Sequence, residues 1–145
     1  MNKGYVDANV ILRFLTGDPP HITEKAASLF RAVERGELRL IVEPIVLAEV
    51  VWVLQSFYRY RPAQIAPVLR EFLLQDGIEA EDKDILLQAL SLYESKNVDF
   101  TEALVTARML KQGVTRIFSF DEHFERLSGI QRIFPGEEIE PNRRG

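Results

Sequence analysis

Apolar side chains recur along the chain with two spacings, which predict strands alternating with helices. Recurrence every three or four residues predicts helices, which we place at residues 10–15, 23–34, 44–57, 62–74, 82–93, 100–110 and 122–127. Short apolar runs predict strands, which we place at residues 3–6, 38–42, 116–120 and 131–134, with another beginning at Ile78. Pro44 suits the first turn of a helix, and Gly36 and Gly113 each follow a predicted helix.

This alternation predicts an α/β fold, in which a short, mainly parallel central sheet is covered by helices on both faces. With 145 residues, 46% of them hydrophobic, the chain is long enough to bury one sizeable core. No internal repeat or low-complexity linker divides it. We therefore expect a single domain over residues 1–136, followed by a charged tail at residues 137–145.

Composition excludes several classes of protein. The chain has no cysteine, which excludes disulfides and thiolate zinc sites, and we interpret His21 and His123 as surface residues because they do not form a metal-binding pair. The longest apolar span, residues 44–54, is about half the length needed to cross a bilayer, and the N-terminus does not resemble a signal peptide. We expect a cytoplasmic protein without a membrane anchor. The formal net charge of -4 argues against a broad basic surface that coats nucleic acid.

Two acidic residues follow predicted strands, Asp7 after the first and Asp121 after the fourth. Ligands of open parallel sheets bind beyond the carboxyl ends of the strands, so both acids are candidates for a functional site. Each also has an ordinary explanation, because aspartate is a favoured helix N-cap. Asp99 and Glu102 likewise match the spacing of a capping box.

Glu49 differs from these acids because its helical neighbours are apolar. Ile45, Val46, Trp52 and Val53 lie three and four positions away, which predicts a buried carboxylate. A buried charge requires compensation, or its pKa rises until it is neutral. A metal ion shared with other carboxylates would compensate it, and a salt bridge to a distant arginine is the structural alternative.

A cluster of carboxylates without histidine or cysteine suits Mg²⁺, or Mn²⁺ in its place, rather than zinc. Such an ion lowers the pKa of a bound water and stabilises the charge that develops on a phosphodiester during hydrolysis. The candidate catalytic and metal-binding residues are Asp7, Glu49, Asp99 and Asp121.

Four arginines are candidate contacts for RNA: Arg13, Arg59, Arg61 and Arg108. Tyr60, between two of them, offers an aromatic ring for base stacking. For each of these four arginines, an ordinary solvated position on the surface is the simpler explanation.

Four motifs in order resemble a PIN domain, and most closely the VapC family of toxins in type II toxin–antitoxin systems. The motifs occupy residues 5–12, 47–50, 98–103 and 118–121. The resemblance implies a three-layer α/β/α sandwich, a Mg²⁺-dependent ribonuclease that cuts single strands, a cognate antitoxin that plugs the acidic pocket, and a homodimer. Asp7, Glu49 and Asp99 match the three central acids and Asp121 the more variable fourth. The polar residues expected to support the pocket are Asn9, Ser119 and Glu102.

The resemblance also implies roles: Asp7 and Asp99 hold the ion, while Glu49 and Asp121 orient its water or a second ion. One alternative is a catalytically silent PIN-like module that binds a partner. Another is a phosphotransfer enzyme or receiver domain, which the Asp7-Ala8-Asn9 sequence disfavours because it lacks a second aspartate. For the dimer, residues 50–57 with Phe72 and Leu73 offer an apolar surface, although a packed core explains them equally well.

Overall fold

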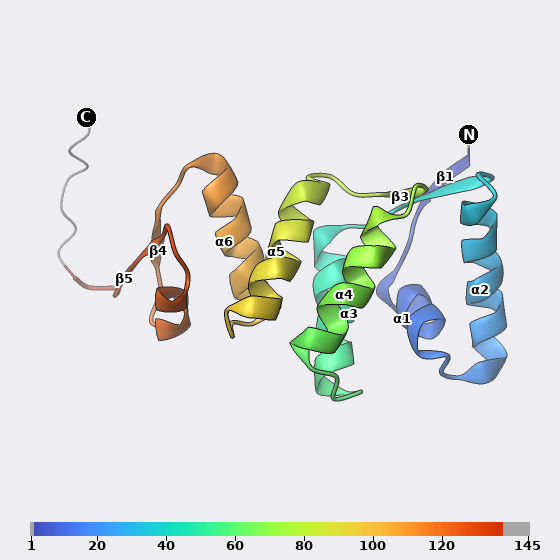
Figure 1. Cartoon of the computed structure of the whole chain (residues 1–145), viewed down its shortest axis with the longest axis horizontal. Coiled ribbons are helices and arrows are strands. Elements are labelled where there is room, and N and C mark those ends of the chain that lie inside the picture. The colour runs from blue at the N-terminus through green and yellow to red at the C-terminus, as the bar shows by residue number, and fades with distance from the viewer. Residues whose placement is uncertain (1, 138–145) are drawn as a thin grey trace.

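The structure, a computed structural model, describes residues 2–137, so the predicted tail beyond Glu137 lies outside the described residues. Figure 1 shows the arrangement of the strands and helices. The strands are β1 (Asn2–Tyr5), β2 (Leu38–Ile41), β3 (Ile78–Glu79), β4 (Arg116–Phe118) and β5 (Gln131–Ile133). The helices are α1 (Ala8–Thr16), α2 (Pro20–Glu34), α3 (Pro44–Ser56), α4 (Pro62–Leu74), α5 (Lys83–Ser95), α6 (Phe100–Gln112) and the 3-10 helix η1 (Glu122–Arg126).

Within residues 2–137 the strands pair in parallel, as the alternation of strands and helices predicts. β2 lies between β1 and β3, with Asn2 opposite Leu38, and β4 pairs with β5, with Arg116 opposite Gln131. The strands therefore form two sheets, with helices α3 to α6 between them in the view of Figure 1. As a result, the strands that precede Asp7 and Asp121 belong to different sheets.

Proline and glycine residues mark several of the helix ends. Proline occupies the first turn of α2, α3 and α4, where its missing N–H costs no hydrogen bond. α2 starts at Pro20, three residues before the predicted start, for this reason. α6 ends at Gly113, whose φ of 73° is left-handed and suits glycine. The predicted helix at 122–127 is a short 3-10 helix instead.

The packing of α5 against α6 fixes the N-terminal end of α6. Leu86 and Leu90 of α5 and Ala103 of α6 are fully buried. The ring of Tyr93 meets the ring of Phe100 edge to face, with centroids 5.9 Å apart. The residue that precedes Phe100 is Asp99, so the core holds one of the predicted site acids in place.

Most of the apolar residues that we considered as a dimer surface, those of residues 50–57 with Phe72 and Leu73, lie in the hydrophobic core. The buried members are Val50, Val51, Leu54, Phe72 and Leu73. Trp52 and Phe57 remain 67% and 71% exposed. Among the helices of residues 2–137, none has the length and apolar character needed to cross a membrane.

Candidate metal centre

The N-terminus of α6 is closed by a reciprocal pair of hydrogen bonds. The Glu102 backbone N–H donates to Oδ1 of Asp99 at 2.8 Å, and the Asp99 backbone N–H donates to Oε1 of Glu102 at 2.9 Å. This is the capping box that the sequence predicts. It fixes both carboxylates at one end of the helix, with Asp99 exposed and the Glu102 side chain only 8% exposed.

The loop after β4 carries Asp121 toward the same end of α6. The Asp121 backbone N–H donates to Oγ of Ser119 at 2.9 Å, and Oδ1 of Asp121 accepts from the backbone N–H of His123 at 2.8 Å. The Ser119 backbone N–H in turn donates to the carbonyl of Ile133 at 3.2 Å. The side chain of Ser119 therefore holds the backbone of Asp121 in place through the hydrogen bond that its Oγ accepts.

Glu102, Asp121 and His123 bring three potential ligand atoms together. One nitrogen or carboxylate oxygen from each lies within 4.8 Å of the other two. Nδ1 of His123 is 3.3 Å from Oε2 of Glu102 and 3.3 Å from Oδ1 of Asp121. Ligand atoms that share one octahedral ion at about 2.1 Å lie about 3 Å apart, so this spacing fits a divalent cation.

The pKa values of the two carboxylates in this cluster shift in opposite directions. Burial, followed by the hydrogen bond to Asp121, raises the pKa of Glu102. The same hydrogen bond, with the His123 backbone N–H, lowers the pKa of Asp121. Two acids whose pKa values are driven apart in this way are typical of a site that binds a cation or moves a proton.

Capping does not exclude a second role for these acids, because each carboxylate has two oxygens. Asp99 uses Oδ1 for its cap and Glu102 uses Oε1, so Oδ2 and Oε2 are not engaged in the capping box. Asp7, the N-cap of α1, accepts from Ala8 N–H through Oδ1 at 2.8 Å and likewise has a second oxygen. The ordinary explanation and the functional one are compatible.

Of the four predicted catalytic acids only Asp121 belongs to the cluster; Asp7, Glu49 and Asp99 lie outside it, Asp99 next to it through the capping box. Within residues 2–137, Glu102, Asp121 and His123 form the one group of three or more ligand side chains this close together. Asp7 is exposed beside Asn9, which lines a hollow between α1 and α2 together with Arg13.

The prediction that Glu49 is buried is wrong. Glu49 is exposed, and so are its neighbours Ile45 and Trp52, at 78% and 67%. The buried face of α3 is formed by Leu47, Val50, Val51 and Leu54. The error arises because apolar neighbours do not ensure burial when a helix is apolar on most sides. The argument that Glu49 requires a compensating charge therefore fails.

Asp99 nevertheless lies close to the helix that carries Glu49. Asp99 and Thr101 line a small cavity together with Ala48, Trp52 and Gln55 of α3. Beneath it, the buried Tyr93 hydroxyl donates to Oε1 of Gln55 at 2.5 Å. Burial and the charge of Asp99 raise the pKa of Tyr93 to about 12.

The four candidate arginines lie in different places. Arg59 and Arg61 are exposed in the loop between α3 and α4, and Arg13 is half-buried on α1. The Arg108 guanidinium pairs with Asp82 at 3.5 Å.

His123 is the site residue that the sequence interpretation missed. The lack of a second histidine at ligand spacing favours a surface role for it in the sequence, whereas the fold places it between two carboxylates. Its position two residues after Asp121, in the segment that follows β4, is the signal that could have identified it.

Comparisons with known proteins identify the family. The profile of the PIN domain family matches residues 4–130. The chain is 26% identical over 133 residues to a VapC ribonuclease of Aquifex aeolicus, covering 92% of this chain and 97% of that protein. It is 29% identical over 133 residues to ribonuclease VapC13 of Mycobacterium tuberculosis, covering 88% of this chain and 97% of the relative. A VapC ribonuclease of Mycobacterium bovis has the same identity and coverage. The chain therefore belongs to the PIN domain family.

Proposed function

We propose that this chain is a metal-dependent endoribonuclease that hydrolyses RNA phosphodiester bonds, and the toxin of a toxin–antitoxin pair. The observation that carries the proposal is the convergence of Glu102, Asp121 and His123 beside Asp99 at the N-terminus of α6. The relatives named as ribonucleases match nearly their whole length, which supports the same activity here.

The donor set fits a divalent cation. Glu102 and Asp121 supply oxygens, with Asp99 next to them, and oxygen ligands suit Mg²⁺ and Mn²⁺. Nδ1 of His123 adds a nitrogen donor, which suits a transition-metal ion better than Mg²⁺. Bound Mg²⁺ would lower the pKa of a water and offset the charge that develops on the phosphodiester. Asp7 and Glu49 remain candidate ligands in this proposal, as the resemblance implies.

The chain's own groups have separable roles in this reaction. The capping box holds Asp99 and Glu102 in fixed rotamers, which reduces the reorganisation needed on binding a cation. Ser119 fixes the backbone of Asp121. His123 lies between the two carboxylates and offers Nδ1 as a third donor to the cation.

The proposal includes partners. RNA is the proposed substrate and the cytoplasm the proposed location, and the resemblance to toxins supports a cognate antitoxin that covers the acidic site. The exposed apolar side chains of Ile45, Trp52 and Phe57 support a homodimer, since large apolar groups on a surface favour association.

The test is cleavage of a mixed pool of structured RNAs by the purified protein with Mg²⁺, with Mn²⁺ and with EDTA. The variants are Asp99→Asn and Asp121→Asn, and the matched control is Asp76→Asn, which removes the same charge from an exposed residue between α4 and β3. We expect discrete cuts that require metal, persist in the control and disappear in both site variants. Cuts that persist in EDTA, or in both site variants, would reject the proposal.

A further inference from the structure

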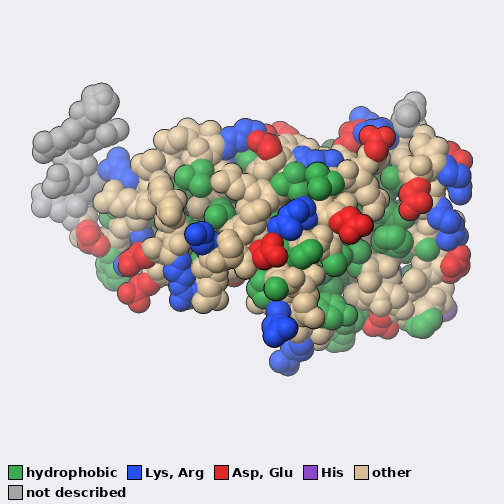
Figure 2. Space-filling model, in the orientation of Figure 1, with side chains coloured by type: hydrophobic (Ala, Val, Ile, Leu, Met, Phe, Trp, Pro, Cys, Tyr) green, Lys and Arg blue, Asp and Glu red, His purple; other side chains and the backbone are tan. Residues whose placement is uncertain are grey.

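The loop between α3 and α4 combines aromatic rings with positive charge. We call residues 57–61, Phe57-Tyr58-Arg59-Tyr60-Arg61, the basic aromatic loop. Arg59 and Arg61 are exposed, and neither forms an ion pair with a carboxylate of residues 2–137. In the space-filling view, basic side chains protrude where this loop lies at the lower edge (Figure 2). The loop therefore presents cationic groups that are not paired with carboxylates of the described residues.

The two tyrosines of the loop have nearly parallel rings. The Tyr58 and Tyr60 rings are inclined by 10°, with their centroids 6.1 Å apart. The Tyr58 hydroxyl donates to Oδ2 of Asp18 at 2.8 Å, which fixes that ring. Tyr60 is 42% exposed, so part of its ring surface is free for a planar ligand.

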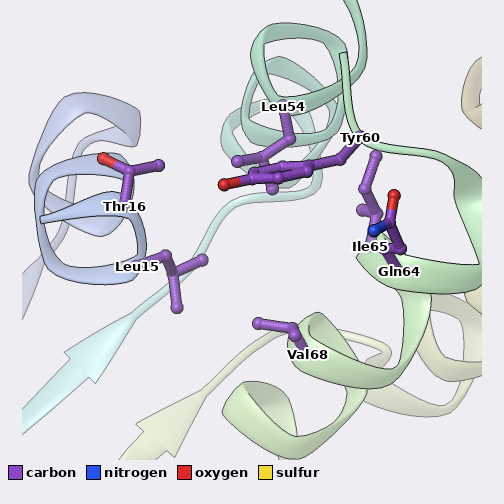
Figure 3. A pocket seen from close by; sticks show the side chains of 7 residues that line it. All are labelled: Leu15, Thr16, Leu54, Tyr60, Gln64, Ile65 and Val68. Atoms are coloured by element: carbon purple, nitrogen blue, oxygen red, sulfur yellow. The ribbon is translucent and has the colours of Figure 1, made fainter. Parts of the chain in front are cut away.

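Tyr60 also forms one wall of a cavity of about 230 Å³ between α1, α3 and α4 (Figure 3). In this view its ring lies across the cavity, with the side chains of Leu15 and Val68 on the other side of the space. The lining is mostly apolar, and Gln64 supplies a polar group. Oε1 of Gln64 accepts the Arg61 backbone N–H at 2.9 Å, so its amide NH₂ remains to donate to a ligand.

The loop is connected to the candidate metal centre by α3. Asp99 lies against the middle of this helix, where it shares a cavity with Ala48 and Trp52. Helix α3 ends at Ser56, directly before the loop. At about 1.5 Å per residue, Trp52 and the end of α3 are about 6 Å apart along the helix axis. Along the helix axis, the loop therefore begins about one turn beyond the residues of α3 that line the Asp99 cavity.

We propose that the basic aromatic loop is a binding subsite for single-stranded RNA, in which Arg59 and Arg61 contact phosphates and one base enters the cavity against Tyr60. This inference rests on the proposed ribonuclease function, whose substrate contacts it locates. Aromatic platforms flanked by arginine suit single strands, because every base has a face to stack and the backbone is negative throughout. An acidic peptide without an aromatic side chain would satisfy the arginines but would leave the Tyr60 face and the cavity without a planar partner.

The experiment measures binding separately from cleavage. Fluorescence anisotropy of labelled single-stranded adenine and uracil oligoribonucleotides is recorded in EDTA with the full chain. The test variants are Arg59→Gln combined with Arg61→Gln, Tyr60→Ala and Tyr60→Phe. The charge control is Arg31→Gln, an exposed residue of α2 that pairs with Glu24. Thermal unfolding of each variant confirms that it is folded.

We expect Tyr60→Ala to weaken binding about fivefold or more, the lower end of what loss of one stacked base costs, and Tyr60→Phe to bind like the wild type. The double arginine variant should reduce the slope of log affinity against log salt by about 1.4, at about 0.7 for each phosphate contact to a single strand. Arg31→Gln should leave the affinity unchanged.

The outcomes separate this inference from the proposed function. If the wild type binds oligonucleotides through the loop and cuts no RNA with Mg²⁺, the subsite stands and the ribonuclease proposal fails. If the wild type cuts RNA while the double arginine variant and Tyr60→Ala bind and cut equally well, the subsite is refuted. Competition by polyglutamate as effective as competition by an unlabelled oligonucleotide would also refute base recognition.

Discussion

Asp99 has two roles, as a helix cap and as a candidate metal ligand, and two substitutions separate them. As the N-cap of α6 it accepts the Glu102 backbone N–H at 2.8 Å through Oδ1, and as a candidate ligand it offers its other oxygen. Asparagine keeps an N-cap acceptor but loses the negative charge, whereas alanine loses both. Comparing Asp99→Asn with Asp99→Ala therefore distinguishes the loss of stability from the loss of activity.

The expected changes in the free energy of unfolding follow from the loss of the N-cap of α6. Removing an N-cap acceptor costs about 1 kcal/mol of helix stability, with a range of roughly 0.5–2 kcal/mol. Loss of a charge near a helix N-terminus costs a further 0.3–1 kcal/mol or so at low salt. We therefore expect Asp99→Ala to lower the free energy of unfolding by about 1.5 kcal/mol, and Asp99→Asn by about 0.5 kcal/mol. Cleavage should fall by at least about 100-fold in both, equivalent to about 2.7 kcal/mol of activation free energy.

The assays are urea unfolding followed by circular dichroism at pH 7.5, and initial rates of RNA cleavage in Mg²⁺ at protein concentrations where each variant is folded. Equal destabilisation by alanine and asparagine would show that the cap is not formed. Full activity in Asp99→Asn would show that the carboxylate charge is not used in cleavage. Either result would refute the dual role of Asp99.

Further substitutions test the core and the cluster. Leu86→Ala should lower the free energy of unfolding by about 3–4 kcal/mol in urea titrations, because Leu86 is fully buried, and a cost below about 1 kcal/mol would argue against that packing. Tyr93→Phe should cost about 1 kcal/mol through the lost bond to Gln55, measured in the same way, and a more stable variant would contradict the bond. The pKa of Glu102 is higher in the folded state than its ordinary value of 4.5, so protonation of Glu102 stabilises the folded state. Without metal, this stabilisation is present at pH values below 4.5 and is lost as the pH rises through the folded pKa. Glu102→Gln should remove this part of the pH dependence in urea titrations from pH 4 to 8, and an unchanged pH profile would contradict it. His123→Gln should weaken Mn²⁺ binding, followed by electron paramagnetic resonance, by about tenfold, and unchanged affinity would remove His123 from the cation site.

The elements of the fold were largely predictable because their determinants are local. The proline at the start of α4 and the apolar period behind it gave both of its bounds, residues 62 and 74. The capping box at Asp99 was visible as a three-residue spacing and is formed as expected. Parallel pairing followed from the alternation of strands and helices. The division of the strands into two sheets depends on long-range packing, which local periodicity does not report.

The candidate site was predictable only in part, because burial and proximity are tertiary properties. Asp121 was identified by its position after a strand and Glu102, as a supporting residue, by the resemblance, and the structure brings them together. Glu49 was given the wrong environment, since exposed apolar neighbours look the same in sequence as buried ones. His123 was missed because a single imidazole becomes a candidate ligand only when the fold places carboxylates around it. The roles given to Asp7 and Glu49 remain predictions.

The central claim is that the carboxylates at the N-terminus of α6 bind a divalent cation. The most direct measurement is a crystal structure of the protein grown with Mn²⁺, with the ion located by its anomalous scattering. The account predicts a peak within about 2.5 Å of carboxylate oxygens of Asp121 and of Asp99 or Glu102, with any contribution of Asp7 and Glu49 visible in the same map. A protein that binds Mn²⁺ only elsewhere, or shows no peak at millimolar Mn²⁺, would contradict it.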